Sequence, residues 1–296
     1  MSGGVFQVFT HAELSLFECR QYAIRLKNQF DIGQIPCHIY TLLTLFPHLI
    51  QVQKAVTIAP SHIACSSCNL SEFCLPSGFT ADEVRQLESI ASTKRAYKRG
   101  DYLYRSGSKF GSLYAIQTGF FKTQVLHEDG REQVTGFQMA GEIIGLDAIS
   151  TDVHTCDAVA LEDSEICELP FNKLEELSRK LPTLQRHLHK IMSREIVRDQ
   201  GIMLLLGSMR AEERLAAFLL NLSQRFAARG LSASTFRLRM TRQEIGSYLG
   251  LKLETVSRTL SYFQESRLID VKSKSIELLD MSGLLGLVGQ QRATPY

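Results

Sequence analysis

Residues 240–264 read MTRQEIGSYLGLKLETVSRTLSYFQ, and this stretch decides the fold of the C-terminal quarter of the chain. Thr241 and Glu244 stand in a Thr-x-x-Glu capping box, which predicts the start of a short helix. Gly250 predicts a tight turn after that helix. A second helix is expected from about Leu253 to Glu265 because its apolar residues recur at helical spacing.

Two short apolar runs follow the helices, at Leu268–Val271 and Ser275–Leu279. Lys272 and Lys274 lie between them, so the runs predict a small basic hairpin. Two helices with a tight turn, followed by a hairpin, are typical of a winged helix-turn-helix.

The second helix carries a polar stripe opposite its apolar side. Arginine pairs bidentately with guanine and glutamate accepts from cytosine N4, so the stripe suits base recognition. A polar stripe alone is more often a solvated surface, but Arg242 and Lys252 beside it favour DNA binding. Residues 208–280 hold 12 Lys/Arg and 8 Asp/Glu, a surplus of 4, whereas the whole chain has a net charge of +2. The stripe consists of Glu254, Ser257, Arg258 and Ser261.

Upstream, apolar residues after Pro182 recur every three or four positions for about 25 residues and predict one long helix. An apolar seam of this length usually faces a twin helix, so we expect a homodimer. Asp199 on the seam has two interpretations: a charge at a splayed end, or a device that weakens dimerisation until something compensates. The predicted dimerisation residues are Leu184, Leu188, Met192, Ile196, Asp199 and Met203. A further helix is expected at about 211–229.

Residues 100–145 hold eight of the chain's 20 glycines, placed between short runs rich in β-forming residues. Such runs, punctuated by glycine turns, predict a compact all-β roll. Glu128-Asp129-Gly130 is a hairpin signal within it, because glycine supplies the positive φ that the turn needs.

Three of the seven cysteines, Cys65, Cys68 and Cys74, lie within ten residues. Clustered thiolates suit a soft metal or an iron–sulfur cluster. The spacing matches neither the usual ferredoxin runs nor a zinc ribbon, so structural zinc and an iron–sulfur cluster stay equally open at this point. A fourth ligand is needed, and the candidates are His62, Cys156, Cys167, Cys19 and Cys37.

The composition is ordinary for a globular protein, with 296 residues, 44% apolar and 22% charged. No apolar run is long enough for a membrane span and the N-terminus does not resemble a secretory signal, so a cytoplasmic protein without a membrane partner is expected. Phosphate-cradling loops, HExxH and nucleophile elbows are absent from the sequence, which argues against an enzyme. Residues 1–60 show no sustained pattern, and either a real extension or a gene-model artefact explains them.

Between about residues 62 and 285 the chain resembles the CRP/FNR superfamily of bacterial transcription regulators, and its FNR type in particular. The resemblance implies an α+β fold: a jelly-roll-like β-roll of the cyclic-nucleotide-binding type, a long dimerisation helix and a C-terminal winged helix-turn-helix. The predicted domains are 1–60, 61–180, 181–208, 209–285 and a tail at 286–296. The matching blocks are Ser112–Ile116 with Gly119, Glu132–Phe137, Gly141–Ile149, Ala211–Phe218, Met240–Leu251 and Glu254–Arg258.

The resemblance also implies a [4Fe–4S] cluster, one per subunit. In the family the fourth cysteine precedes Glu-x-Pro-Phe, which here is Cys167, while Cys156 falls outside the pattern and is expected in the core. Cyclic-nucleotide-binding relatives hold the phosphate with an Arg-Ser pair, but residues 146–160 contain no Arg or Lys, so no cyclic nucleotide is expected. The implied ligands are Cys65, Cys68, Cys74 and Cys167.

As implied by the family, the protein is an oxygen-responsive, anaerobic global regulator. The intact cluster promotes a dimer that binds double-stranded DNA with TTGAT-like half-sites. In this dimer Glu254, Ser257 and Arg258 recognise the bases. Oxygen or nitric oxide destroys the cluster. Lys252 stands where relatives often have Ser or Thr, so the recognition helix loses a usual N-cap. The alternative is a regulator of the same superfamily with structural zinc and another signal. The turn expected to contact RNA polymerase is His127, Glu128, Asp129, Gly130 and Arg131.

Overall fold

The computed structural model describes residues 79–126 and 130–289. These residues form a β-roll, a long helix and a C-terminal helix-turn-helix module. Cys65, Cys68 and Cys74, the turn at 127–129 and the segment at 1–60 lie outside the described residues.

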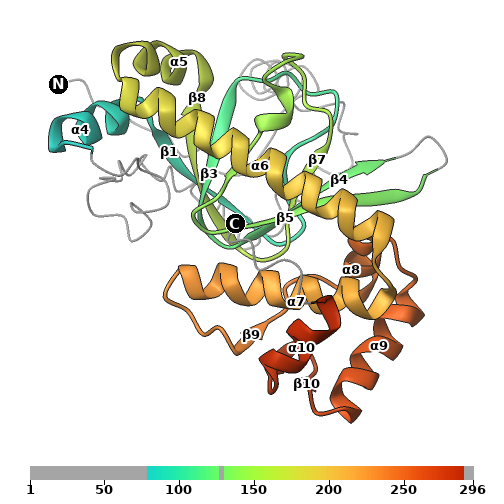
Figure 1. The fold of residues 1–296 in the computed structure, drawn as a ribbon. Coiled ribbons are helices and arrows are strands. Elements are labelled where there is room, and N and C mark those ends of the chain that lie inside the picture. The colour runs from blue at the N-terminus through green and yellow to red at the C-terminus, as the bar shows by residue number, and fades with distance from the viewer. Residues whose placement is uncertain (1–78, 127–129, 290–296) are drawn as a thin grey trace, which may run out of the picture. The chain divides into compact units, whose positions relative to one another are not determined.

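Two four-stranded antiparallel sheets make up the roll, in the orders β1-β8-β3-β6 and β2-β7-β4-β5 (Figure 1). The β-roll expected from the glycine-punctuated runs is confirmed. Its strands are β1 (Ser92–Tyr97), β2 (Tyr102–Tyr104), β3 (Ser112–Thr118), β4 (Phe120–Leu126), β5 (Glu132–Met139), β6 (Ile143–Ile144), β7 (Asp157–Ala160) and β8 (Ser164–Pro170), with a 3-10 turn η3 at Leu146–Ala148.

Gly119 joins β3 to β4 with a φ of +97°, a left-handed conformation that glycine adopts without strain. A Cβ at this position would lie 2.0 Å from the Ser164 Oγ at the start of β8. Only glycine therefore lets the β3–β4 turn approach the start of β8 this closely.

Three helices cover one end of the roll and lead to the next domain. Leu174 and Leu177 of α5 are buried together with Leu184 of α6 and Leu87 of α4, so the helices share a hydrophobic core with the roll. The long helix predicted after Pro182 is confirmed, with that proline in its first turn, whereas α4 and α5 were not predicted. The helices are α4 (Ala81–Ile90), α5 (Phe171–Lys180) and α6 (Pro182–Ser208).

The C-terminal module follows α6 and is a winged helix-turn-helix. Its sheet has the order β10-β11-β9, so the expected two-stranded hairpin gains a third strand. The last helix runs past residue 285, where the sequence places the end of the domain. The elements are α7 (Ala211–Ala228), β9 (Thr235–Arg237), α8 (Arg242–Leu249), α9 (Leu253–Glu265), β10 (Ile269–Lys272), β11 (Ser275–Leu278) and α10 (Met281–Val288).

One hydrophobic core extends from the roll into the C-terminal module. Phe137 of β5 is the junction, because its ring centroid lies 6.1 Å from that of Phe218 on α7 and 5.1 Å from that of Tyr248 on α8. Aromatic pairs at these distances pack favourably beyond their buried area. The module is therefore packed against the β4–β5 side of the roll.

Candidate nucleic-acid interface and metal centre

The first helix of the helix-turn-helix begins as the sequence predicts. Thr241 Oγ1 accepts from the Glu244 backbone N–H at 3.1 Å, and the Glu244 carboxylate accepts from the Thr241 N–H at 2.7 Å. These bonds satisfy two of the N–H groups left open at a helix start, and the capping box is confirmed.

Two glycines set the angle between α8 and α9. Gly250 ends α8 in the left-handed region at a φ of 63°. Gly246 lies where the turn folds back on the helix, and a Cβ there would stand 2.6 Å from the Leu251 carbonyl oxygen. The recognition helix therefore starts at a position fixed by close backbone approach.

Helix α9 presents a polar face outward, as expected. Val256, Leu260 and Phe263 are buried in the module, whereas the stripe points the other way. Glu254, Arg258 and Ser261 are exposed, and Ser257 is half-buried, with its Oγ accepting from Arg242 Nη1 at 3.3 Å. The structure thus brings all six predicted DNA-binding residues to one exposed region on α8 and α9, including exposed Lys252.

Lys252 is the N-cap of α9 and makes no side-chain capping bond, which confirms the loss expected from the sequence. Its charge stays at the start of the recognition helix, where it suits a phosphate. Tyr262, the next residue after Ser261, is also exposed on α9. In the wing, Lys272 is paired with Asp270 at 2.8 Å.

The seam residues of α6 separate into two groups. Leu184 is 2% exposed in the core beside α5, and Leu188 is partly buried against the same core, so both pack within one chain. Ile196 is 57% exposed and Met203, seven residues on, is 65% exposed. Met192 is half-buried, and Asp199 is exposed between the two large apolar side chains.

Cys167 is half-buried in the middle of β8, opposite Ala115 of β3 and Lys94 of β1 in the backbone register. Its neighbour Ile166 points into the roll core. Because side chains alternate along a strand, Cys167 points to the other side of its sheet. Among residues 79–126 and 130–289, no cluster of three His, Cys, Asp or Glu forms a complete metal site.

Cys156 lies in the roll core, as expected. Burial, reinforced by the Asp147 carboxylate, raises the pKa of the Cys156 thiol to about 12. Metals bind the thiolate, so a thiol that stays protonated is poorly suited as a ligand. The donor set implied by the family, which omits Cys156 and includes Cys167, fits these observations.

Asp147 lies within residues 146–160, the stretch of the sequence that contains no Arg or Lys. Its carboxylate accepts from the Thr155 N–H at 2.8 Å and from Tyr104 Oη at 3.3 Å. The Tyr104 ring stacks on the buried His154 ring at 3.7 Å between centroids. A carboxylate in this stretch disfavours a bound phosphate, because like charges repel, and the packed rings fill the space beside it.

The β4–β5 turn ends at Gly130, whose φ of 81° confirms the glycine turn signal. Arg131 beside it is exposed. The other three residues expected to contact polymerase, at 127–129, lie outside the described residues.

Polar contacts between α8 and the roll were missed by the sequence analysis. Lys122 of β4 pairs with Glu244 at 2.9 Å, and Ser247 Oγ accepts from the Val134 N–H at 2.8 Å. Burial would raise the pKa of Glu244, but Lys122 and the Thr241 N–H outweigh it and hold that pKa below its usual value. The partners are over a hundred residues apart in sequence, so no local pattern indicates them.

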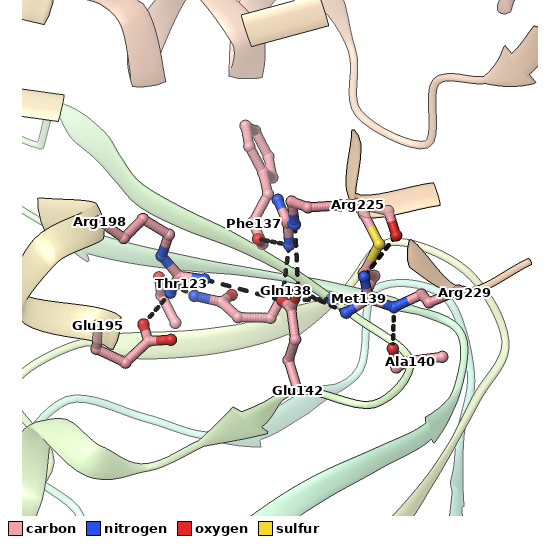
Figure 2. A network of polar contacts seen from close by, with 10 residues as sticks. All are labelled: Thr123, Phe137, Gln138, Met139, Ala140, Glu142, Glu195, Arg198, Arg225 and Arg229. Atoms are coloured by element: carbon pink, nitrogen blue, oxygen red, sulfur yellow. Dashed lines mark hydrogen bonds and ion pairs between the residues drawn. The ribbon is translucent and has the colours of Figure 1, made fainter. Parts of the chain in front are cut away.

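A second missed group centres on Glu142, between β5 and β6, whose carboxylate is surrounded by Arg198, Arg225 and Arg229 (Figure 2). In the sequence, Arg225 and Arg229 are four residues apart. This spacing is common on solvated helix faces, so it does not indicate a buried ion-pair network.

Comparisons with known proteins agree with this architecture. The family of Crp-like helix-turn-helix domains matches residues 213–287, and the family of cyclic nucleotide-binding domains matches residues 94–180. The chain is 46% identical over 227 residues to the transcriptional activator protein anr of Pseudomonas aeruginosa, which covers 77% of this chain and 93% of the relative. It is 45% identical over 230 residues to the fumarate and nitrate reduction regulatory protein of Yersinia pestis, covering 78% and 92%.

A solved structure of FixK2 from Bradyrhizobium japonicum is 31% identical, with a TM-score of 0.62, covering 67% of this chain and 97% of FixK2. A CooA mutant from Carboxydothermus hydrogenoformans shares the fold at 18% identity and a TM-score of 0.58, covering 75% and 96%. No helix within the described part of the chain is both long and apolar enough to cross a membrane.

Proposed function

Because the chain belongs to the FNR-type branch of the CRP/FNR transcription regulators, we propose that it senses oxygen through a [4Fe–4S] cluster and binds palindromic DNA as a dimer. Its relatives and its helix-turn-helix make it a DNA-binding transcription regulator and not an enzyme. The cluster, the signal and the polymerase contact are the parts that we propose.

The exposed face of α9 is the observation that carries the DNA-binding proposal. Glu254 and Arg258 lie one helical turn apart on it, above a fully buried apolar side. Glutamate accepts a hydrogen bond from cytosine N4, and arginine donates to guanine O6 and N7. Glu254 and Arg258 together therefore recognise the G·C base pair of a TTGAT-like half-site. Ser257, Ser261, Arg242 and Lys252 surround that pair.

We assign the cluster to Cys65, Cys68, Cys74 and Cys167. When bound, the cluster supplies thiolate bonds that tie the N-terminal cysteines to β8, and oxygen or nitric oxide destroys it. Cys167 suits this role because its strand pairs with both β1 and β3 at the centre of its sheet, which holds the thiolate on a rigid support.

Dimerisation uses the outer part of α6. Ile196 and Met203 are large apolar side chains on one exposed face, and a second copy of the helix would bury them. Asp199 stands between them, so its twin would approach it in a parallel pair and the two carboxylates would repel each other. The dimer is therefore weak until the sensor domain compensates for that repulsion.

Cyclic nucleotides are not the signal in this proposal, because the Asp147 carboxylate occupies the stretch that would have to hold their phosphate. We assign the contact with RNA polymerase to the β4–β5 turn at 127–131, where Gly130 and Arg131 are exposed at the end of the hairpin.

Metal analysis tests the sensor proposal directly. Protein purified without oxygen is expected to be brown, to contain about four iron and four sulfide per chain, and to bleach in air. A colourless protein with one zinc that air does not change would overturn the cluster assignment and favour a structural zinc site with another signal.

The DNA-binding face is tested separately with Arg258→Ala. We expect this variant to lose specific binding to a palindromic duplex while keeping its fold, since the side chain is exposed. Arg179→Ala is the matched control, because that arginine is also exposed but lies on α5. Undiminished binding by the Arg258 variant would show that α9 does not recognise the bases.

A further inference from the structure

Glu142 is the centre of an ion-pair network that joins three elements of the fold. Arg225 of α7 binds both of its carboxylate oxygens, at 2.6 Å and 3.1 Å, and Arg229 of the next turn donates at 2.7 Å (Figure 2). Arg198 of α6 lies 3.8 Å from the same carboxylate and also pairs with Glu195.

Arg225 of α7 and Arg229, which caps the end of that helix, also bind the roll's backbone. Arg225 donates to the Phe137 carbonyl at 2.7 Å, and Arg229 donates to the Ala140 carbonyl at 2.5 Å. The Glu142 carboxylate in turn accepts from the Met139 N–H at 3.2 Å. Helix α7 is thus held over two successive turns to the segment between β5 and β6 by charge-assisted bonds.

The network is shielded from solvent, which sets it apart from the surface ion pairs of the chain. The Glu142 side chain is 17% exposed and that of Arg229 is 9% exposed. Burial would raise the pKa of Glu142, but Arg225, Arg198 and Arg229 outweigh it and hold that pKa below its usual value. Glu142 therefore stays charged, and its loss would leave arginines without their buried partner.

Glu142 is also close in the fold to the strand that carries Cys167. The Glu142 carbonyl accepts from the Ile116 N–H of β3 at 2.9 Å, and Ile116 pairs with Ile166, the residue before Cys167, across the sheet. On its other side, Arg198 directly precedes Asp199 of the dimerisation helix. The network thus contacts the sensor sheet, the dimerisation helix and the DNA-binding module at once.

We propose that Glu142 is a positioning residue that locks the DNA-binding module to the sensor roll, and that this lock is required for the dimer to bind DNA tightly. A module held through α7 keeps its recognition helix at a fixed angle to the dimer axis, so two helices reach successive grooves together. Without the lock each α9 still folds and recognises its half-site, but the pair no longer binds as one rigid unit. The inference rests on the proposed dimeric DNA binding.

The test is the affinity of protein purified without oxygen for a duplex with two inverted TTGAT half-sites. Glu142→Gln keeps the shape and removes the charge, and we expect about tenfold weaker binding, the scale of coupling within an ion-pair network. Sedimentation is expected to show an unchanged dimer. The control is Glu176→Gln, which removes an exposed pair with Lys180 inside α5 and leaves affinity unchanged.

Combined variants separate a lock from a general weakening of the fold. Arg225→Gln is expected to lose about as much affinity as Glu142→Gln, and the double variant little more than either, because all three break the same contact. The proposal is overturned if the losses of affinity of the two single variants multiply in the double variant. It is also overturned if a folded Glu142→Gln dimer binds the duplex with an affinity within twofold of that of the unmodified protein.

If Glu142→Gln fails to fold, the folded Arg225→Gln dimer decides alone, and full affinity then overturns the lock. If the unmodified protein fails to bind the duplex, the proposed function itself is wrong, an outcome distinct from failure of the lock.

Discussion

A methyl group added at Gly246 tests whether the turn between α8 and α9 is as tight as the structure shows. The new Cβ of Gly246→Ala would lie 2.6 Å from the Leu251 carbonyl oxygen and 3.5 Å from Val256 Cγ2. The oxygen belongs to the backbone, so it cannot rotate away, and the turn leading to the recognition helix must move. Overpacking of this kind costs about 1–3 kcal/mol, against about 1 kcal/mol gained by replacing glycine within a helix.

The net loss expected for Gly246→Ala is about 1 kcal/mol or more, which corresponds to roughly 4–8 °C in the melting temperature of a module of this size. The matched control is Gly286→Ala on α10, in the same module, where nothing lies within 4 Å of the new Cβ. That control should be unchanged or more stable, by up to about 1 kcal/mol.

DNA affinity gives a second readout for the same pair of variants. A shift of α9 disturbs the bidentate contacts of its exposed face, each worth about 1–3 kcal/mol, so Gly246→Ala should bind the palindrome roughly tenfold more weakly. Circular dichroism melts and DNA titrations measure the two effects. If Gly246→Ala has the same melting temperature as Gly286→Ala and keeps full DNA affinity, the close approach at this turn has no energetic consequence and the reasoning fails.

Three further predictions concern the dimer, the cluster and pH. Asp199→Ala should form a dimer in air because the repulsion between the paired carboxylates is gone, whereas Gln200→Ala should stay monomeric. If sedimentation shows monomers for both variants, Asp199 does not control dimerisation. Cys167→Ser should lose iron when purified without oxygen, and Cys156→Ser should keep it, which iron analysis decides. The pKa of Glu142 is lowered in the folded state, so its stabilisation is present above its ordinary pKa of 4.5 and is lost as pH falls through the lower folded value. Melting temperatures between pH 6 and pH 3.5 should therefore fall less for Glu142→Gln than for the unmodified protein, and parallel curves would count against that role.

Elements with a strong local signal could be predicted closely. The short β-forming runs predicted between the glycines of residues 100–145 are observed as strands, β4 (Phe120–Leu126) among them, because glycines or turn residues flank them. The long helix begins at Pro182 as expected, because proline in the first turn and sustained apolar spacing agree. The capping box of Thr241 likewise fixed the start of α8.

Short elements and distant partners could not be predicted in the same way. Strand β9 has only three residues and finds its place by pairing with β11, so it carries no period of its own. Helix α5 spans ten residues, too few turns for a clear pattern. Arg225 and Glu142 are 83 positions apart, and only the fold brings them together.

The candidate site shows the same division. Periodicity separated the exposed face of α9 from buried Val256 and Phe263, and the structure agrees. Periodicity could not separate the two groups on α6, because apolar residues at three- and four-residue steps face either the chain's own core or a partner. Leu184 is in the core and Met203 is exposed, although both belong to one sequence pattern.

The contacts between roll and module bear on how the signal acts. An apolar junction at Phe137, the ion pair of Lys122 with Glu244 and the Glu142 network all hold the module to its own roll. Breaking all three to swing the module would expose buried aromatic surface and unpaired charges together. Control through association of α6 requires none of this, since it needs only a change in the balance between apolar burial at Ile196 and repulsion at Asp199. Under the proposed dimerisation, the DNA-binding half is therefore preset within each chain, and the signal decides whether two chains pair.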